Sequence, residues 1–159
     1  MTLGKLSPKS LWIKNPIAVL SENDCKGGVV VAEGKIVELV TAGNSPVIDV
    51  DATFDASHLV VLPGLINTHH HFYQTLTRAF SKSLNKDLFP WLMSLYPVWA
   101  NLRPSDISIS SRLAMVELLL SGCTTTVDHH YVFSNSLTDA IEIQIEEAKK
   151  LGMRAVFTR

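Results

Sequence analysis

Hydrophobic and polar residues follow two different patterns along the chain. Up to about residue 58, short apolar runs are separated by turn-forming residues, and Val29–Val31 and Ile36–Val40 flank Ala32-Glu33-Gly34-Lys35. This arrangement predicts a hairpin, because the glycine can adopt the positive φ that a tight turn requires. We expect further short strands at Leu11–Ile13, Ile17–Leu20 and Pro46–Ile48. Residues 1–58 therefore form a β-rich module with too few strands to close a sandwich alone.

From residue 59 onward the pattern alternates between strands and helices. Leu59–Ile66, Cys123–Asp128 and Arg154–Thr158 predict three strands. A long aromatic-rich connection after the first strand is expected to hold one or two helices, with Pro90 near a helix start and Pro97 at a break or kink. The order of strands and helices predicts a parallel sheet with right-handed crossovers.

Two further helices have clear boundary signals. One is expected from Pro104-Ser105-Asp106 to a stop at Gly122. The other is expected from a cap in Ser136-Leu137-Thr138-Asp139 to Gly152, with Glu146 and Lys150 as an i,i+4 pair.

The expected fold class is α/β, the N-terminal part of a TIM (β/α)8 barrel preceded by a small β module. A complete barrel needs about 250 residues, and only residues 59–159 follow the module. We therefore expect these residues to be the first β/α units of an incomplete barrel, in the N-terminal portion of a longer enzyme.

Composition narrows the possible partners. A net charge of -1, from 14 basic and 15 acidic residues, gives no reason to expect nucleic acid or an anionic membrane, and leaves small neutral ligands open. Cys25 and Cys123 are far apart and fit neither a disulfide framework nor a sulfur-ligated zinc site. Without a signal peptide or an apolar run of about 20 residues, we expect a cytoplasmic protein.

The run His69-His70-His71 is the strongest chemical signal. Side chains two apart on a strand share a face, so His69 and His71 point together, whereas His70 faces the helical layer and is expected to donate to a backbone carbonyl. Two imidazoles on one strand suit zinc or a similar divalent ion. Catalytic zinc normally has about three protein ligands and a water, so the two histidines fill about half of its coordination positions.

A second cluster, Asp128-His129-His130, ends the next strand at the same rim of the sheet. For His129 and His130, contact with the substrate or a hydrogen bond to a residue that binds the metal is favoured over direct metal ligation. Asp128 is expected either to orient an imidazole or to cap the following turn.

Other polar and aromatic residues are candidates for a substrate pocket. Gln74 offers a donor and an acceptor, which suits the edge of a heterocycle, although it fits a solvated surface residue equally well. Trp91 and Tyr96 are suited to stack on a planar ligand or to pack in the core, and core packing is favoured for Trp99. Arg78 is expected either to bind a carbonyl or to cover surface.

At these residues the chain resembles the amidohydrolase superfamily, in its branch of guanine, 8-oxoguanine and triazine deaminases and chlorohydrolases. The family motif stands as Pro63-Gly64-Leu65-Ile66-Asn67-Thr68-His69-His70-His71. The stretches that look most like 8-oxoguanine deaminases are Asn67–Arg78, Leu88–Leu92, Leu95–Trp99 and Thr126–Tyr131.

This resemblance implies a mononuclear site with His69 and His71 as the first two metal ligands, holding zinc or, alternatively, iron. Two later histidines, an aspartate and the proton-transfer residues lie outside these 159 residues, so no catalytic residue is assigned. Gln74 takes the place of the glutamine that contacts the purine edge, and His130 and Trp91 complete the expected substrate-binding set. The N-terminal strands would form part of the family's small β-sandwich.

The expected reaction of the full-length enzyme is hydrolytic deamination of an aminated heterocycle. 8-Oxoguanine is the leading substrate, followed by guanine, isocytosine or a triazine, and a homo-oligomer is expected. One alternative is a triazine chlorohydrolase or alkylaminohydrolase. The other is that the 159-residue chain is by itself an inactive partial barrel with exposed sheet edges.

Overall fold

A computed structural model describes residues 8–20, 24–134 and 137–159. These residues divide into two compact units, one ending at Pro63 and one running from Gly64 to Arg159, and each is described by itself. We expected the β module to end at residue 58. The contacts divide the chain five residues later, because β6 (Val60–Val61) pairs in parallel with β2 (Ala18–Val19).

The first unit is built on a four-stranded sheet in the order β4-β3-β1-β5. Its strands are β1 (Ser10–Lys14), β3 (Gly28–Ala32), β4 (Lys35–Val40) and β5 (Ala52–Asp55). The predicted hairpin is confirmed as the antiparallel pair β3–β4, and Glu33 and Gly34 in its turn have φ angles of 49° and 75°. Trp12, Val30 and Val40 form the small core of this unit.

The expected strand at Pro46–Ile48 is wrong. The Val47 amide donates to the Glu38 carboxylate at 3.0 Å instead of entering a ladder, and the Val47 side chain is 92% exposed. The strand is found later, at β5, which pairs in parallel with β1. The short apolar run therefore lies in a loop that is fixed by a carboxylate.

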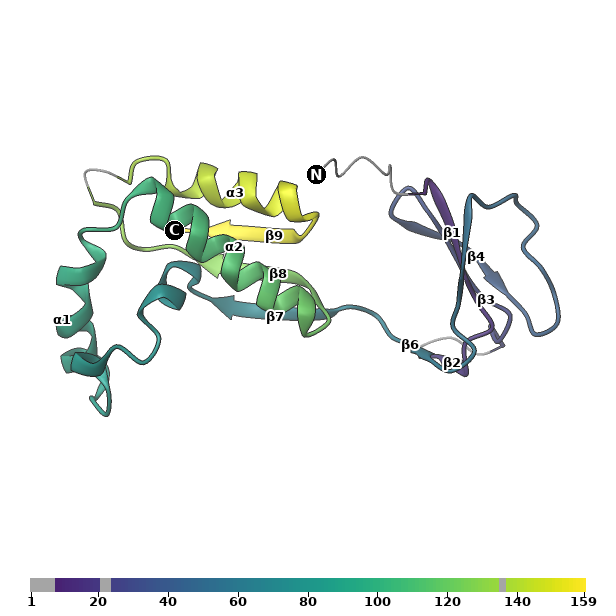
Figure 1. Cartoon of the computed structure of the whole chain (residues 1–159), viewed down its shortest axis with the longest axis horizontal. Coiled ribbons are helices and arrows are strands. Elements are labelled where there is room, and N and C mark those ends of the chain that lie inside the picture. Colours follow the sequence, from purple (N-terminus) through teal and green to yellow (C-terminus); the bar gives the residue numbers. More distant parts are fainter. Residues whose placement is uncertain (1–7, 21–23, 135–136) are drawn as a thin grey trace, which may run out of the picture. The chain divides into compact units, whose positions relative to one another are not determined.

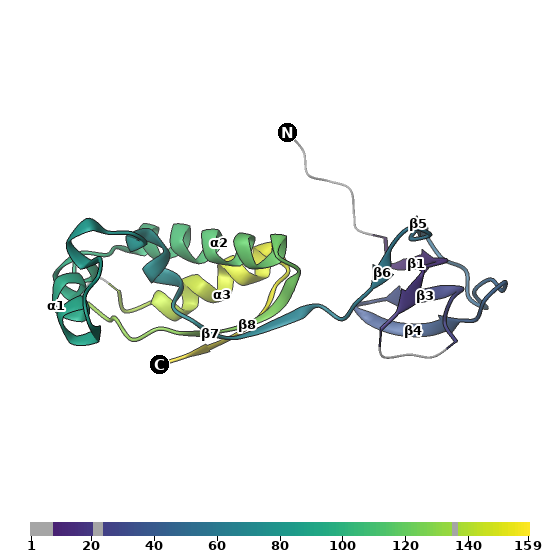
Figure 2. The same cartoon turned by 90° about the horizontal axis from the view of Figure 1, so that it is seen from below.

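The second unit contains a parallel sheet in the order β7-β8-β9, with bounds Leu65–His70, Cys123–His129 and Arg154–Thr158. Helices α2 (Pro104–Leu120) and α3 (Ala140–Leu151) cover one face of this sheet (Figures 1 and 2). The predicted parallel arrangement is confirmed. The described strands form an open sheet and do not close a barrel.

The single strand expected at Leu59–Ile66 is instead two strands, β6 and β7, interrupted at Pro63-Gly64. Proline has no amide hydrogen to donate to a ladder. A Cβ on Gly64 would lie 2.0 Å from Thr124 Oγ1, so glycine lets the backbone approach β8 closely. The second strand then extends to His70, which brings the histidine run to its carboxyl end.

The connection after β7 holds two short 3-10 helices, η1 (Phe72–Thr77) and η2 (Ser81–Ser83), and then α1 (Leu88–Trp99). Pro90 lies in the first turn of α1 and Pro97 lies inside it. The predicted start and stop of α2 are confirmed, because Asp106 accepts the Arg103 amide at 2.9 Å and Gly122 has a φ of 84°.

Helix α3 begins directly after Asp139 and ends before Gly152 as predicted, but the capping bond and the ion pairs differ from expectation. Asp139 precedes α3 without a side-chain capping bond, and Ser136 lies outside the described residues. The expected Glu146–Lys150 pair is wrong. Lys150 pairs with Glu147 and Lys149 pairs with Glu146, both three residues apart, since Glu147 points inward toward α2.

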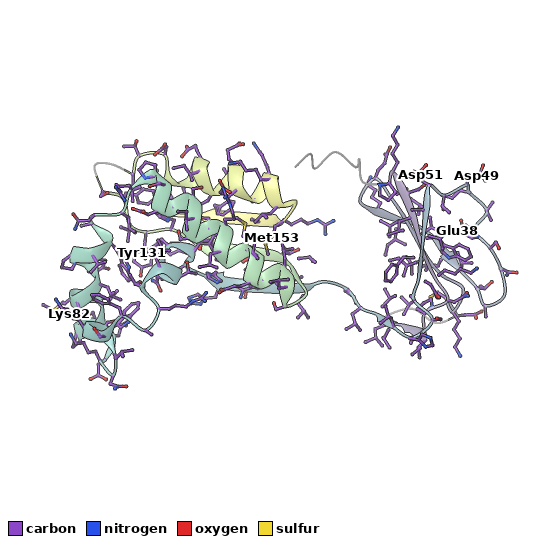
Figure 3. The ribbon with its side chains drawn as sticks, viewed as in Figure 1. Glu38, Asp49, Asp51, Lys82, Tyr131 and Met153 are labelled. Atoms are coloured by element: carbon purple, nitrogen blue, oxygen red, sulfur yellow. The ribbon has the colours of Figure 1, made fainter. Side chains whose placement is uncertain are left out.

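Two clusters of buried side chains stabilise the second unit. One gathers Tyr73, Leu95 and Trp99, which confirms core packing for Trp99. The other gathers Phe72, Met115 and Met153, and Figure 3 labels Met153 among the side chains. Among the residues that the structure describes, no helix has the length and apolar character needed to cross a bilayer.

Candidate metal centre and substrate pocket

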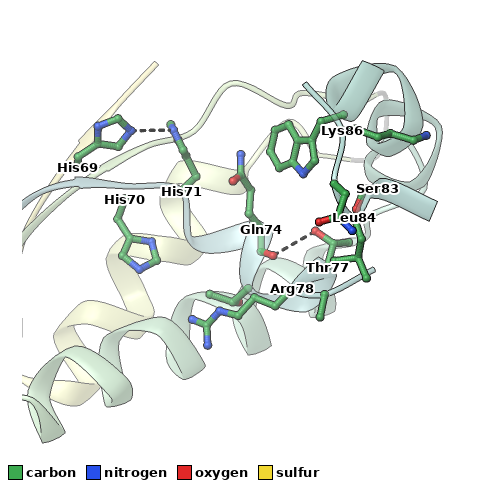
Figure 4. A pocket seen from close by; sticks show the side chains of 13 residues that line it. His69, His70, His71, Gln74, Thr77, Arg78, Ser83, Leu84 and Lys86 are labelled. Carbon is green, nitrogen blue, oxygen red and sulfur yellow. Dashed lines mark hydrogen bonds between the residues drawn. The ribbon is translucent and has the colours of Figure 1, made fainter. Parts of the chain in front are cut away.

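The rings of His69 and His71 converge at the carboxyl end of β7. Their Nε2 atoms are 3.3 Å apart, and the rings meet edge to face with centroids 5.1 Å apart. Figure 4 shows both rings on one side of the chain and His70 on the other. The alternation of side chains expected of a strand therefore continues through His71, one residue beyond the end of β7 at His70.

The contact made by Nδ1 of His71 shows which ring nitrogen carries the hydrogen. Nδ1 lies 2.7 Å from the carbonyl oxygen of His129 on β8. A carbonyl only accepts, so Nδ1 carries the hydrogen and the Nε2 lone pair faces His69. This is the hydrogen bonding that typically supports a histidine ligand of a metal.

The donor geometry fits a metal ion. Two nitrogens that each lie about 2.05 Å from one ion, at a tetrahedral angle, are about 3.3 Å apart, which is the separation found here. In the described part of the chain, no group of three His, Cys, Asp or Glu side chains gathers at one point. The chain therefore offers two of the ligands that such a site requires.

A cavity of about 560 Å³ opens beside the two rings. Its lining includes His69, His71, Gln74 and Trp91, and these four come from β7, the turn after it, η1 and α1. Four of the five residues expected at the site therefore lie around one cavity. Its volume suits a small heterocyclic molecule.

Gln74 has a fixed side chain within this cavity. Its Nε2 donates to Tyr131 Oη at 2.9 Å and lies 3.3 Å from Tyr73 Oη. The amide nitrogen is thus occupied by two phenols, and the amide oxygen is left as an acceptor. Tyr131 was not among the expected site residues, although it follows His130 directly in the sequence.

Trp91 is half-buried and packs edge to face on Trp99, with ring centroids 5.5 Å apart. Tyr131 continues this aromatic group, because its ring lies 5.2 Å from that of His71 and 5.5 Å from that of Tyr73. One aromatic wall therefore joins the core of the unit to the histidine rings.

His130 lies elsewhere, which corrects its expected place in the substrate pocket. The residue is fully buried, Nε2 is 2.7 Å from the Val132 carbonyl oxygen, and the ring packs between Tyr73 and Phe133. Burial lowers the pKa of the imidazole. The parity of β8 explains the difference, since His130 shares the buried side with Asp128 and Thr126.

His70 faces the helical layer as expected, packed edge to face on Phe72 at 4.9 Å. We predicted that His70 donates to a backbone carbonyl. This prediction is wrong for Nδ1, which is buried and has no hydrogen-bond partner among the described residues. Burial lowers the pKa of this imidazole, and the Arg78 charge lowers it further. His70 is thus a neutral packing residue.

Among the described residues, the carboxylate of Asp128 bonds neither an imidazole ring nor the turn that follows it. Its Oδ1 accepts the Phe72 amide at 2.6 Å, and its Oδ2 accepts Gln144 Nε2 at 2.7 Å. Burial raises the pKa of this carboxyl to about 6, and the bonds from Phe72 and Gln144 oppose that shift. Phe72 and Gln144 lie 56 and 16 residues from Asp128 in the sequence, so sequence spacing did not reveal either partner.

Arg78 lies at the edge of the cavity, where its guanidinium is held by Glu117 on α2 through two hydrogen bonds, one of 2.8 Å. The paired carboxylate raises the pKa of Arg78 and lowers that of Glu117. Of the two roles expected for it, surface cover fits this geometry.

Two curated proteins are similar to this chain in sequence. The 8-oxoguanine deaminase of Pseudomonas aeruginosa is 55% identical over 150 residues, which are 93% of this chain and 33% of that protein. Isoxanthopterin deaminase from an unknown prokaryotic organism is 37% identical over 107 residues, which are 66% of this chain and 22% of that protein. The chain thus spans a third or less of these curated relatives.

A solved structure and a family profile extend the comparison. The crystal structure of atrazine chlorohydrolase from Arthrobacter aurescens TC1, complexed with zinc, superposes with a TM-score of 0.78 at 26% identity, over 92% of this chain and 35% of that one. The profile described as "Amidohydrolase family" matches residues 60–159, which are more than half of the chain. The chain belongs to the amidohydrolase family.

Proposed function

We propose that this chain supplies two metal ligands and part of the substrate pocket of a metal-dependent deaminase with a TIM barrel. The observation that carries the proposal is the 3.3 Å separation of His69 Nε2 and His71 Nε2 beside the Gln74 cavity. In the barrel architecture, reactive groups gather at the carboxyl ends of parallel strands, and both histidines are found there.

His69 and His71 would hold the metal, and zinc is the first candidate because the related atrazine chlorohydrolase is complexed with it. Imidazole also suits iron, which remains the alternative. A bound zinc would lower the pKa of a water molecule toward about 7. The further ligands and the proton-transfer groups would come from outside these 159 residues.

The residues of this chain would bind and orient the substrate. The amide oxygen of Gln74, for which the described residues show no donor, can accept from a ring N–H, because the amide nitrogen is committed to Tyr131 and Tyr73. Trp91 would cover one side of a flat ring, and the aromatic wall would reduce access of bulk water.

We propose 8-oxoguanine as the leading substrate, with support from the 55% identity to an 8-oxoguanine deaminase. Isoxanthopterin, the substrate of a second relative, is also an aminated bicyclic heterocycle. A triazine hydrolase is the second candidate, favoured by the structural match to atrazine chlorohydrolase. A homo-oligomer stays a prediction.

A chimera tests the substrate. The 159 residues replace the matching third of the Pseudomonas aeruginosa 8-oxoguanine deaminase, and the zinc-loaded protein is offered 8-oxoguanine, guanine, isocytosine and atrazine. Ammonia release from 8-oxoguanine is expected, as with the parent enzyme. Chloride release from atrazine would favour the second candidate. A folded chimera that acts on none of them, beside an active parent, contradicts both.

The chain by itself is a separate case. With two ligands from β7, we expect the 159-residue protein to bind zinc weakly and to release no ammonia from these substrates. Turnover by the isolated chain would contradict the view that the further ligands lie elsewhere.

A further inference from the structure

The chain turns sharply just after His71. It leaves β7 and enters η1, whose first residue is Phe72. The first amides of a helix need acceptors from outside it. His71 precedes η1 without a side-chain capping bond, and the carboxylate of Asp128 on β8 takes that place, accepting the Phe72 amide at 2.6 Å.

The carboxylate of Asp128 is itself held from the helical side. Its second oxygen accepts Gln144 Nε2 from α3 at 2.7 Å. Phe72, Asp128 and Gln144 are all fully buried. Because the carboxylate is bonded at both of its oxygens, it fixes the backbone beside His71.

The residue after Asp128 holds the ring of His71. The His129 carbonyl oxygen lies 2.7 Å from His71 Nδ1. On β9, Thr158 Oγ1 lies 2.8 Å from His129 Nδ1 and donates to the Asp128 carbonyl oxygen at 3.4 Å. Two adjacent residues of β8 thus hold the ring of His71 and the amide that follows it.

We propose that Asp128 and Gln144 are positioning residues for His71: together they hold the backbone so that its Nδ1 meets the His129 carbonyl and its Nε2 faces His69. The inference rests on the proposed metal site. A metal site tolerates ligand displacements of about 0.2 Å, and loss of a supporting group costs about 10- to 100-fold in metal affinity.

The test measures zinc affinity of the 159-residue chain by competition with a chromophoric chelator, at a temperature where circular dichroism shows each variant to be folded. Asp128→Ala is expected to weaken zinc binding by about 10- to 100-fold. Glu147→Ala is the matched control. It removes another buried carboxylate of the same unit, which bonds Arg112 and Ser108 and does not touch His71.

A conservative variant separates positioning from charge. In Asp128→Asn, the amide oxygen can still accept from Phe72, and the amide nitrogen can donate to Gln144 Oε1, which is buried without a partner among the described residues. The zinc affinity of Asp128→Asn is then expected to lie within about threefold of that of the unsubstituted chain. If Asp128→Ala binds zinc like the original chain, or if Glu147→Ala loses as much affinity, the proposal is overturned.

A metal-free measurement keeps this inference separate from the proposed function. In ¹⁵N NMR of the zinc-free chain, His71 is expected as the Nδ1–H tautomer, and Asp128→Ala is expected to mix the two tautomers, with His71→Gln used to assign the signal. An unchanged tautomer contradicts positioning. If the original chain binds no zinc but the tautomer shifts, only the metal site fails. Should Asp128→Ala not fold, Gln144→Ala serves in both measurements.

Discussion

The two strand ends that carry five of the six histidines look alike in sequence and differ in structure. At the end of β7, the rings of His69 and His71 face each other beside a cavity. At the end of β8, His129 offers its backbone carbonyl and His130 is buried among aromatic rings. One end presents ring nitrogens, and the other supports them.

The role of each histidine therefore depends on the partners of its second ring nitrogen and of its backbone. His71 has its Nδ1 bound to a carbonyl, which turns the lone pair of Nε2 toward His69 Nε2, 3.3 Å away. His129 has its Nδ1 at Thr158 Oγ1, and its ring centroid is 6.0 Å from that of His71. Histidine content alone would assign both ends the same function.

The largest expected effect tests this contrast directly. His71→Ala or His69→Ala removes one of two converging nitrogens and is expected to weaken zinc binding by about 100-fold or more. His129→Ala keeps the backbone carbonyl and is expected to change the affinity less than about fivefold. Equilibrium dialysis against buffered zinc measures both, and an equal loss in His129→Ala would make the two ends alike.

The next effect concerns stability. His130→Ala leaves a cavity beneath Tyr73 and Phe133, and we expect unfolding free energy to fall by about 2 to 4 kcal/mol. Zinc affinity of the folded protein is expected to stay unchanged. Urea denaturation followed by tryptophan fluorescence gives the first value. A stable variant that had lost zinc would contradict the packing role.

A smaller effect comes from Glu147, a buried carboxylate that belongs to neither strand end. Bonds from Arg112, Lys150 and Ser108 lower its pKa from 4.5 to about 2. Because the folded pKa lies below the unfolded one, this stabilisation is present above about pH 4.5 and is lost as the pH falls toward about 2. The full shift corresponds to about 3 kcal/mol, which solvent screening reduces because the side chains of Arg112 and Lys150 are more than half exposed.

Acid denaturation at a series of pH values checks this prediction. Glu147→Gln is expected to flatten the dependence of stability on pH below about pH 4.5. Glu146→Gln is the control, since that carboxylate is exposed and forms an ion pair with Lys149. An unchanged slope in Glu147→Gln would show that other carboxylates govern the acid limit.

The smallest expected effect concerns the cavity. In the chimera, Tyr131→Phe removes the phenol that holds the Gln74 amide, and KM for 8-oxoguanine is expected to rise by about three- to tenfold with kcat little changed. Tyr96→Phe is the control, because Tyr96 lies on α1 outside the cavity lining. Equal effects of the two variants would contradict a role for Tyr131 in orienting Gln74.

Much of the fold could be predicted because its signals are local. A glycine in the β3–β4 turn, Pro104 with Asp106 at the start of α2, and Gly152 after α3 each act within a few residues. The expected strand at Pro46–Ile48 failed because a distant carboxylate, Glu38, takes the Val47 amide. An apolar run does not reveal such a partner.

The sequence alone predicts that His69 and His71 share a face, because side chains alternate along any strand. It also determined the parallel order of β7, β8 and β9, since crossover helices separate them. The folded structure was needed to show that His130 is buried, that Tyr131 holds Gln74, and that Asp128 holds the turn after His71. These contacts join residues distant in sequence, and burial with hydrogen-bond geometry selects them only after the chain has packed.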